Sequence, residues 1–148
     1  MEGEIYDNIV SDYDAIKTNP QKKHIEEPTV WASIGDIDGQ TVLDLACGNG
    51  YYSRRMRKRG AKLVLGLDIS SRQIEEARNL GDPGSGSRKS LVYEVGDAGQ
   101  ETSLKICRQY CENGFDSVVG IFLFPYASTK EQLRSMCKTA FGPELLFS

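Results

Sequence analysis

The sequence predicts an α/β protein with a parallel β-sheet between layers of helices. Short apolar runs recur at residues 41–45, 63–68, 91–95 and 115–124, and each suits a strand that is buried on both faces. The stretches between these runs have helical spacing over about ten residues, which is typical of βαβ units with right-handed crossovers. A sheet of this kind binds its ligands beyond the carboxyl ends of its strands.

The helices between the strands have recognisable ends. Gly60 follows the helix predicted over 51–59, at the usual position for a glycine after a helix end. Ser70 is a good N-cap for the next helix, which extends to about residue 80. The rest of the chain predicts, in order, helices over about 103–113 and 129–140 and a candidate fifth strand over 144–147.

Residues 1–40 precede the first strand and are predicted to form a helical cap. Apolar residues recur there at helical spacing, and one helix is expected over about 25–34 with Pro28 in its first turn. Residues 41–148 then form the ligand-binding domain. A chain of 148 residues leaves no room for a second large domain.

Composition argues against several classes of protein. The formal net charge is only −3, which disfavours binding to nucleic acid or to an anionic membrane. No apolar run approaches the roughly 20 residues that cross a bilayer, and no secretory leader pattern opens the chain. The four cysteines have neither disulfide-scaffold spacing nor accompanying histidines at zinc spacing. We therefore expect reduced thiols, no metal and a cytoplasmic location.

A glycine-rich turn after the first strand is the main functional feature. Gly48 and Gly50 carry no Cβ, so backbone N–H groups can approach a ligand closely. Asp68 ends the second strand 20 residues after Gly48, a spacing expected for a carboxylate that accepts hydrogen bonds from both hydroxyls of a ribose. Together these residues indicate a nucleoside-containing ligand.

Three details separate a dinucleotide from other nucleosides. When Ala46 and Gly48 are aligned with the first two glycines of a dinucleotide fingerprint, Tyr51 stands where a small third residue is needed. Asp44 precedes the loop, where a carboxylate suits the ammonium group of an amino-acid ligand better than a pyrophosphate. Asp97 ends the third strand and can accept a hydrogen bond from an adenine amino group, while Ala98 leaves room for the ring.

Four stretches in register resemble class I S-adenosylmethionine (SAM) dependent methyltransferases of the small-molecule type. They are Val42–Gly50, Gly66–Ser70, Val95–Ala98 and Phe115–Val119. The resemblance covers roughly residues 40–140. It implies a Rossmann-like three-layer sandwich with strand order 3-2-1-4, extended by a fifth strand where one is present. A less specific resemblance to the helical cap of such enzymes lies in the N-terminal segment.

The resemblance also implies roles for individual residues, with SAM as the cofactor and a small molecule as methyl acceptor. The residues expected to contact the cofactor, from the methionine end to the adenine end, are Asp44, Ala46, Gly48, Gly50, Asp68, Ile69, Asp97 and Ala98, with Phe122 near the cofactor at the end of the fourth strand.

No universal catalytic residue is expected, because methyl transfer from a sulfonium is an in-line displacement in which positioning supplies much of the rate. A base is needed only where the acceptor arrives protonated. Tyr13, His24 and Tyr126 are the candidates, since the cap and the end of the fourth strand are where an acceptor would enter.

Structural interpretations stand beside these functional ones. Taken singly, the glycines and acids could be turn residues or helix caps, the tyrosines could be core residues, and His24 could be solvated. The basic residues between 54 and 59 are expected on the exposed side of their helix, so no nucleic-acid partner is predicted.

The chain ends at Ser148, whereas class I methyltransferases have seven strands. We therefore expect a shortened member with an uncovered sheet edge and a homodimer through that edge. Two other functions stay open: a SAM-binding or interaction protein without turnover, and an NAD-dependent oxidoreductase, which Tyr51 and Asp97 disfavour.

Overall fold

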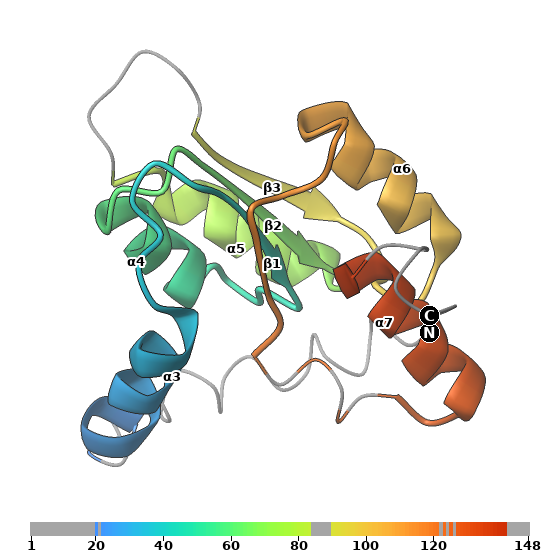
Figure 1. Cartoon of the computed structure of the whole chain (residues 1–148), viewed down its shortest axis with the longest axis horizontal. Helices are drawn as coiled ribbons and strands as arrows, with labels where there is room; N and C mark the ends of the chain where they lie inside the picture. The colour runs from blue at the N-terminus through green and yellow to red at the C-terminus, as the bar shows by residue number, and fades with distance from the viewer. Residues whose placement is uncertain are drawn as a thin grey trace.

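Four parallel strands form the centre of the fold in the computed structural model (Figure 1). They are β1 (Thr41–Leu45), β2 (Leu63–Asp68), β3 (Leu91–Val95) and β4 (Ser117–Val119). Their order across the sheet is β3-β2-β1-β4, which confirms the predicted order, and all three pairings are parallel. The structure describes residues 20, 22–83, 90–121, 123, 125 and 127–141.

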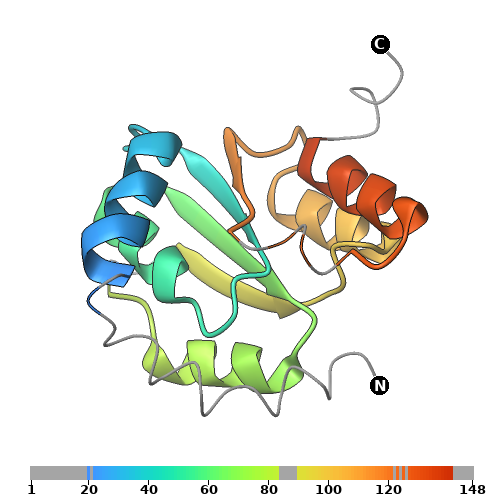
Figure 2. The same cartoon turned by 90° about the horizontal axis from the view of Figure 1, so that it is seen from below.

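Helices cover both faces of this sheet (Figures 1 and 2). A π-helical turn, η1, runs into α3, and these two pack beside α4 and α5 on one face. The other face carries α6 and α7. The helix bounds are η1 (Lys22–Glu26), α3 (Glu27–Ile34), α4 (Tyr51–Lys58), α5 (Ser71–Leu80), α6 (Glu101–Tyr110) and α7 (Lys130–Phe141).

The side chains of β1 point alternately to the two faces of the sheet, and each face has its own core. Val42 faces the core beneath α4 and α5, while Leu43 and Leu45 face the core beneath α6 and α7. All three side chains are buried. Asp44 shares the first face with Val42, so the single acid of this strand is directed toward α4.

The structure corrects the predicted length of the fourth strand. Pairing with β1 covers only Ser117–Val119, rather than 115–124. It begins after Asp116, whose carboxylate accepts hydrogen bonds from the backbone and the hydroxyl of Thr41 at 2.8 and 2.9 Å. A turn follows, and Leu123 is buried in the core beneath α6 and α7. An apolar run alone does not distinguish a strand from a loop whose side chains are buried.

Other element boundaries differ less. The helix predicted over 103–113 spans Glu101–Tyr110, and the one predicted over 25–34 begins as η1 at Lys22. The candidate fifth strand at 144–147 lies outside the described residues.

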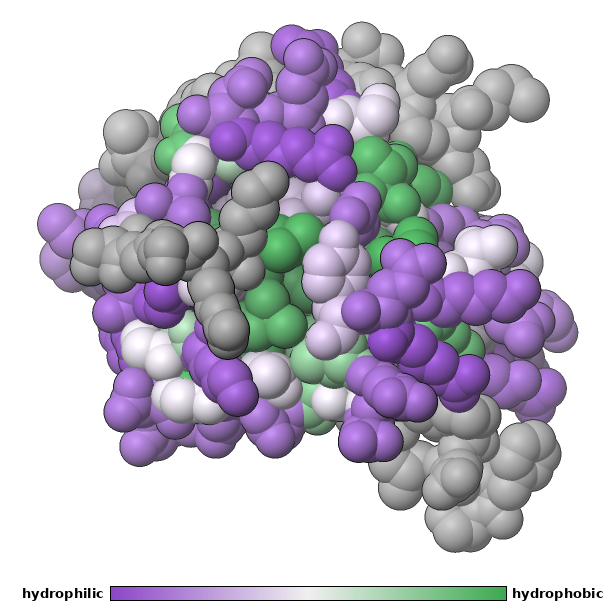
Figure 3. Space-filling view, turned by 90° about the horizontal axis from the view of Figure 1, so that it is seen from above, coloured by the Kyte–Doolittle hydropathy of each residue, from purple (hydrophilic) through white to green (hydrophobic). Residues whose placement is uncertain are grey.

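At the end of the molecule that is uppermost in Figure 1, apolar side chains reach the surface between polar ones (Figure 3).

Gly66 of β2 is required by the packing of Tyr93. The Tyr93 ring, from β3, lies across Gly66, and its hydroxyl approaches the carbonyl oxygen of Gly50 at 3.5 Å. A Cβ at Gly66 would stand 2.6 Å from Tyr93 Cδ1 and 2.9 Å from Cys47 Sγ. A glycine inside a strand often marks such a close approach. Here it allows a β3 side chain to support the loop after β1.

We expect Gly66→Ala to lower the free energy of unfolding by about 1–3 kcal/mol, because the added methyl group displaces the Tyr93 ring. Urea denaturation measures this. The matched control repeats Gly66→Ala in a Tyr93→Val background, where the ring is absent. The cost should then be smaller; equal costs in both backgrounds would contradict the packing argument.

Candidate cofactor site

The loop between β1 and α4 turns sharply through left-handed backbone conformations. Ala46, Gly48 and Gly50 have φ values of 57°, 55° and 76°. The Cys47 N–H donates to the carbonyl of Leu67 in β2 at 3.1 Å, and the Gly50 N–H donates to the carbonyl of Cys47 at 3.0 Å. These bonds hold the loop against the end of β2 and place the N-terminus of α4 immediately after Gly50.

Asp68 connects this loop to the end of β2. One carboxylate oxygen accepts the Gly48 N–H at 2.8 Å, and the other accepts the Ser70 N–H at 2.9 Å. Ser70 caps α5 as predicted, with its hydroxyl accepting the Gln73 N–H at 3.2 Å. The spacing of 20 residues therefore brings Gly48 and Asp68 into direct contact.

Asp44 is buried at the base of the loop, with only 2% of its surface exposed. The Ser53 hydroxyl, on α4, donates to its carboxylate at 2.5 Å. Burial raises the pKa of Asp44 to about 7, and the charge of Asp68 adds to this rise, while the hydrogen bond from Ser53 opposes it. Ser53 was not predicted. The signal for it is a hydroxyl in the helix that follows the loop, where it can reach back to the preceding strand.

The end of β3 lies at the same edge of the sheet. The Gly96 N–H donates to the carbonyl of Asp68 at 2.9 Å, so Asp97 follows directly beside β2. The Asp97 carboxylate accepts the Gly99 N–H at 2.7 Å. Ala98 is buried, and its carbonyl accepts a hydrogen bond from Thr139 of α7 at 2.7 Å. Asp97 and Ala98 are thus held in place next to the Asp68 end of β2, as predicted.

The remaining candidates are distributed differently. Ile69 is half-buried immediately after Asp68. His24 is exposed on η1. Tyr13, Phe122 and Tyr126 lie outside the described residues. The structure therefore brings together the predicted cofactor residues from the ends of β1, β2 and β3.

Tyr51 and Tyr52 connect α4 to the segment before β1. The Tyr51 hydroxyl donates to Glu27, and the Tyr52 hydroxyl donates to Glu26 at 2.6 Å. Tyr52 is buried and meets the Trp31 ring edge-on, with centroids 5.8 Å apart. Burial raises the pKa of Tyr51 to about 12, with the hydrogen bond to Glu27 acting in the same direction. Both rings therefore pack against the segment before β1.

Three basic residues between 54 and 59 contact other parts of the chain, although the sequence predicted that they lie on an exposed helix face. The Arg55 guanidinium lies 3.6 Å from the centroid of the Tyr51 ring, and that of Arg59 lies 4.0 Å from the centroid of the Trp31 ring. Arg54 donates to the carbonyl of Asn49 at 2.6 Å, which braces the loop from outside. These arginines therefore help to join the cap, α4 and the loop.

Among the described residues, no three histidine, cysteine, aspartate or glutamate side chains are grouped closely enough to hold a metal ion. None of the helices in the described part of the chain is long and apolar enough to cross a membrane.

The fold and the loop define an α/β domain built to hold a nucleoside-containing ligand at the carboxyl edge of its sheet. A family model described as a methyltransferase domain matches residues 42–141. The chain therefore belongs to the class I SAM-dependent methyltransferase family.

Three similar proteins cover different shares of the chain, and two of them are named as transferases. An uncharacterized protein of Haemophilus influenzae is 28% identical over 147 residues, which cover 96% of this chain and 55% of the relative. A tRNA U34 carboxymethyltransferase of Colwellia psychrerythraea is 54% identical over 35 residues, 24% of this chain and 11% of that protein. A ubiquinone biosynthesis O-methyltransferase of Leptothrix cholodnii is 44% identical over 46 residues, 31% of this chain and 19% of that protein.

The chain thus spans about half the length of the Haemophilus relative and less of the other two. Among solved structures, a SAM-dependent methyltransferase from Mesorhizobium loti superposes with a TM-score of 0.56 at 23% identity, covering 78% of this chain and 48% of that one. This likeness supports the fold.

Ala46 is the one described residue other than glycine with a positive φ. A Cβ in the left-handed region costs free energy that glycine avoids, so Ala46→Gly should raise the free energy of unfolding by about 0.5 kcal/mol. Urea denaturation measures the change. Ala77→Gly, in the regular helix α5, is the control and should be destabilising. A loss of stability in both variants would contradict the assigned strain.

Proposed function

We propose that this chain binds SAM along the carboxyl edge of its sheet and transfers the methyl group to a small-molecule acceptor. The observation that carries the proposal is the Asp68 carboxylate, which joins the glycine-rich loop to the start of α5 through Gly48 and Ser70. It stands between Asp44, at the end of β1, and Asp97, after β3. An elongated amino-acid nucleoside has one charged end and one aromatic end, which match these two flanks.

In this arrangement each end of the cofactor meets a different strand. Asp44 faces the ammonium group of the methionine moiety, with Ala46, Gly48 and Gly50 lining that moiety. Asp68 accepts hydrogen bonds from the ribose hydroxyls. Asp97 accepts one from the adenine amino group, and Ile69 and Ala98 flank the ring.

Transfer is then a single in-line displacement at the sulfonium methyl group. The acceptor atom forms the new bond to carbon as the carbon–sulfur bond breaks, and S-adenosylhomocysteine leaves with the electron pair of that bond. Held in near-attack geometry, the two reactants need little further assistance. Tyr13, His24 and Tyr126 are proposed as residues near the entering acceptor, and one of them serves as base where the acceptor is protonated.

A small acceptor is favoured over nucleic acid by the way the structure uses its basic residues. Arg54, Arg55 and Arg59 contact the loop, Tyr51 and Trp31 instead of forming a free basic patch. The formal net charge of −3 agrees with this.

The four cysteines are free thiols, which supports a reducing compartment such as the cytoplasm. They are Cys47, Cys107, Cys111 and Cys137.

Titration calorimetry with SAM, S-adenosylhomocysteine and NAD tests the cofactor. We expect binding of the first two and none of NAD. Asp68→Asn should weaken SAM binding by about 10–100-fold, because hydrogen bonds to a charged acceptor are worth roughly 1.5–3 kcal/mol. Glu75→Gln, exposed on α5, is the matched control and should bind normally. A response to NAD alone, or equal losses in both variants, would contradict the proposal.

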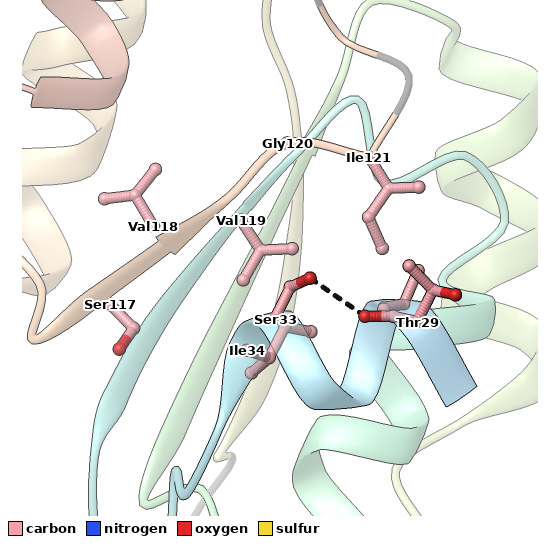
Figure 4. A pocket seen from close by; sticks show the side chains of 9 residues that line it. Thr29, Ser33, Ile34, Ser117, Val118, Val119, Gly120 and Ile121 are labelled. Carbon is pink, nitrogen blue, oxygen red and sulfur yellow. Dashed lines mark hydrogen bonds between the residues drawn. The ribbon is translucent and has the colours of Figure 1, made fainter. Parts of the chain in front are cut away.

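We further propose that a second copy of the chain pairs with the outer edge of β4. A groove of about 450 Å³ lies between this edge and α3, with Ser33 and Ile34 on one wall and Val119 and Ile121 on the other (Figure 4). Among the described strands, β4 has only β1 as a neighbour. An edge strand exposes unpaired backbone groups, and a two-fold axis can pair identical edges.

The oligomeric state checks this pairing. Val118 of β4 is 38% exposed, so Val118→Lys places a charge at the proposed contact and should convert a dimer to a monomer in size-exclusion chromatography with light scattering. Leu133→Lys is the control, since Leu133 is 41% exposed on α7. A wild-type chain that stays monomeric as its concentration rises would overturn the dimer.

A further inference from the structure

Asp44 is a buried carboxylate without a cationic partner among the described residues. Its hydrogen-bond donor is the neutral hydroxyl of Ser53, and its exposed fraction is 2%. Burying an ionised carboxylate is costly unless a positive charge or several hydrogen bonds compensate it. Asp68, by contrast, is half-buried and accepts two backbone N–H groups. The two acids at the base of the loop therefore differ in how well their charge is stabilised.

The other titratable groups around Asp44 leave this charge uncompensated. Cys47, in the loop, and Tyr93, on β3, both have raised pKa values because they are buried, so both are neutral near pH 7. Asp68, on β2, adds a negative charge. The Arg54 guanidinium, on α4, donates a hydrogen bond to the carbonyl of Asn49. Its charge opposes the rise in the pKa of Cys47 and of Tyr93. On β4, the residue level with Asp44 is Val119, which is apolar.

We propose that Asp44 makes the site selective for positively charged ligands by exchanging its own proton for the ammonium group of the cofactor. Below about pH 7 and without ligand, Asp44 is mostly a carboxylic acid. When the ligand enters, the O–H bond breaks, the proton leaves to solvent, and the carboxylate accepts a hydrogen bond from the ligand ammonium. This inference rests on the proposed function, because it takes the bound molecule to be SAM or its demethylated product.

Proton exchange has a defined pH dependence. Asp44 has a folded-state pKa of about 7, so below that pH the ligand must displace a proton from it. Apparent affinity for SAM should then rise about tenfold for each pH unit up to about pH 7 and level off above it. A neutral nucleoside that lacks the amino-acid group, such as 5′-methylthioadenosine, displaces no proton and should bind independently of pH in this range.

Calorimetry in two buffers of different ionisation enthalpy, cacodylate and MES, at several pH values from about 5.5 to 7, measures affinity and the protons released together. Wild-type protein should release close to one proton per SAM at the acidic end, and S-adenosylhomocysteine should behave alike because it keeps the ammonium group. Asp44→Asn should bind SAM more weakly, release no proton and lose the slope. Asp68→Asn is the control, and it should bind more weakly but keep the slope.

A SAM affinity that does not change with pH, a slope that persists in Asp44→Asn, or an equal slope for 5′-methylthioadenosine would overturn the inference. Thermal unfolding without ligand separates this failure from failure of the proposed function. The folded-state pKa of Asp44 lies above the unfolded value of 3.8, so the folded state binds the extra proton.

Wild-type protein should therefore lose stability relative to Asp44→Asn as pH rises from about 4 to 7. A constant difference between their melting temperatures would overturn the protonation of Asp44 even if SAM does not bind. Loss of SAM binding together with the expected drift would overturn the proposed function and, with it, the exchange.

Discussion

The hydrogen bonds accepted by the Asp68 carboxylate are the interaction on which the rest of the site depends. One oxygen holds the Gly48 N–H of the loop, and the other holds the Ser70 N–H at the start of α5. The Asp68 carbonyl, in turn, accepts the Gly96 N–H after β3. A single residue at the end of β2 thus orders the segments that follow β1, β2 and β3.

Asp44 and Asp68 lie close together at the same edge of the sheet, and their carboxylates are stabilised unequally. Asp68 accepts hydrogen bonds from two backbone N–H groups at a half-buried position, while Asp44 is buried with one hydroxyl donor. The difference arises from strand geometry, because Asp44 shares the inward face of β1 with Val42. A ligand cation would compensate the charge of the buried Asp44 carboxylate. A side chain that destabilises the domain on its own can therefore favour cationic ligands.

The contacts of α4 show how the cap and the loop form one unit. Tyr51 and Tyr52 follow Gly50 directly and bond to Glu27 and Glu26. Arg55 of α4 lies over the Tyr51 ring, and Arg59, just after α4, lies over the Trp31 ring. Movement of the cap would therefore be transmitted to the first residues after the loop. The sequence predicted a solvated face for the basic residues between 54 and 59, because local spacing carries no information on which distant rings and carboxylates they meet.

By itself the sequence predicted the strands β1, β2 and β3 and the candidate cofactor residues at their ends, and its resemblance to class I methyltransferases implied the order of these strands with β4. The strands and the glycine-rich turn could be predicted because they depend on local periodicity and glycine positions. Only the tertiary structure decided that β4 ends at Val119, that Ser53 is the partner of Asp44, and that Gly66 accommodates Tyr93. Each of these depends on which side chains from other elements share a space, and that is settled when the layers pack.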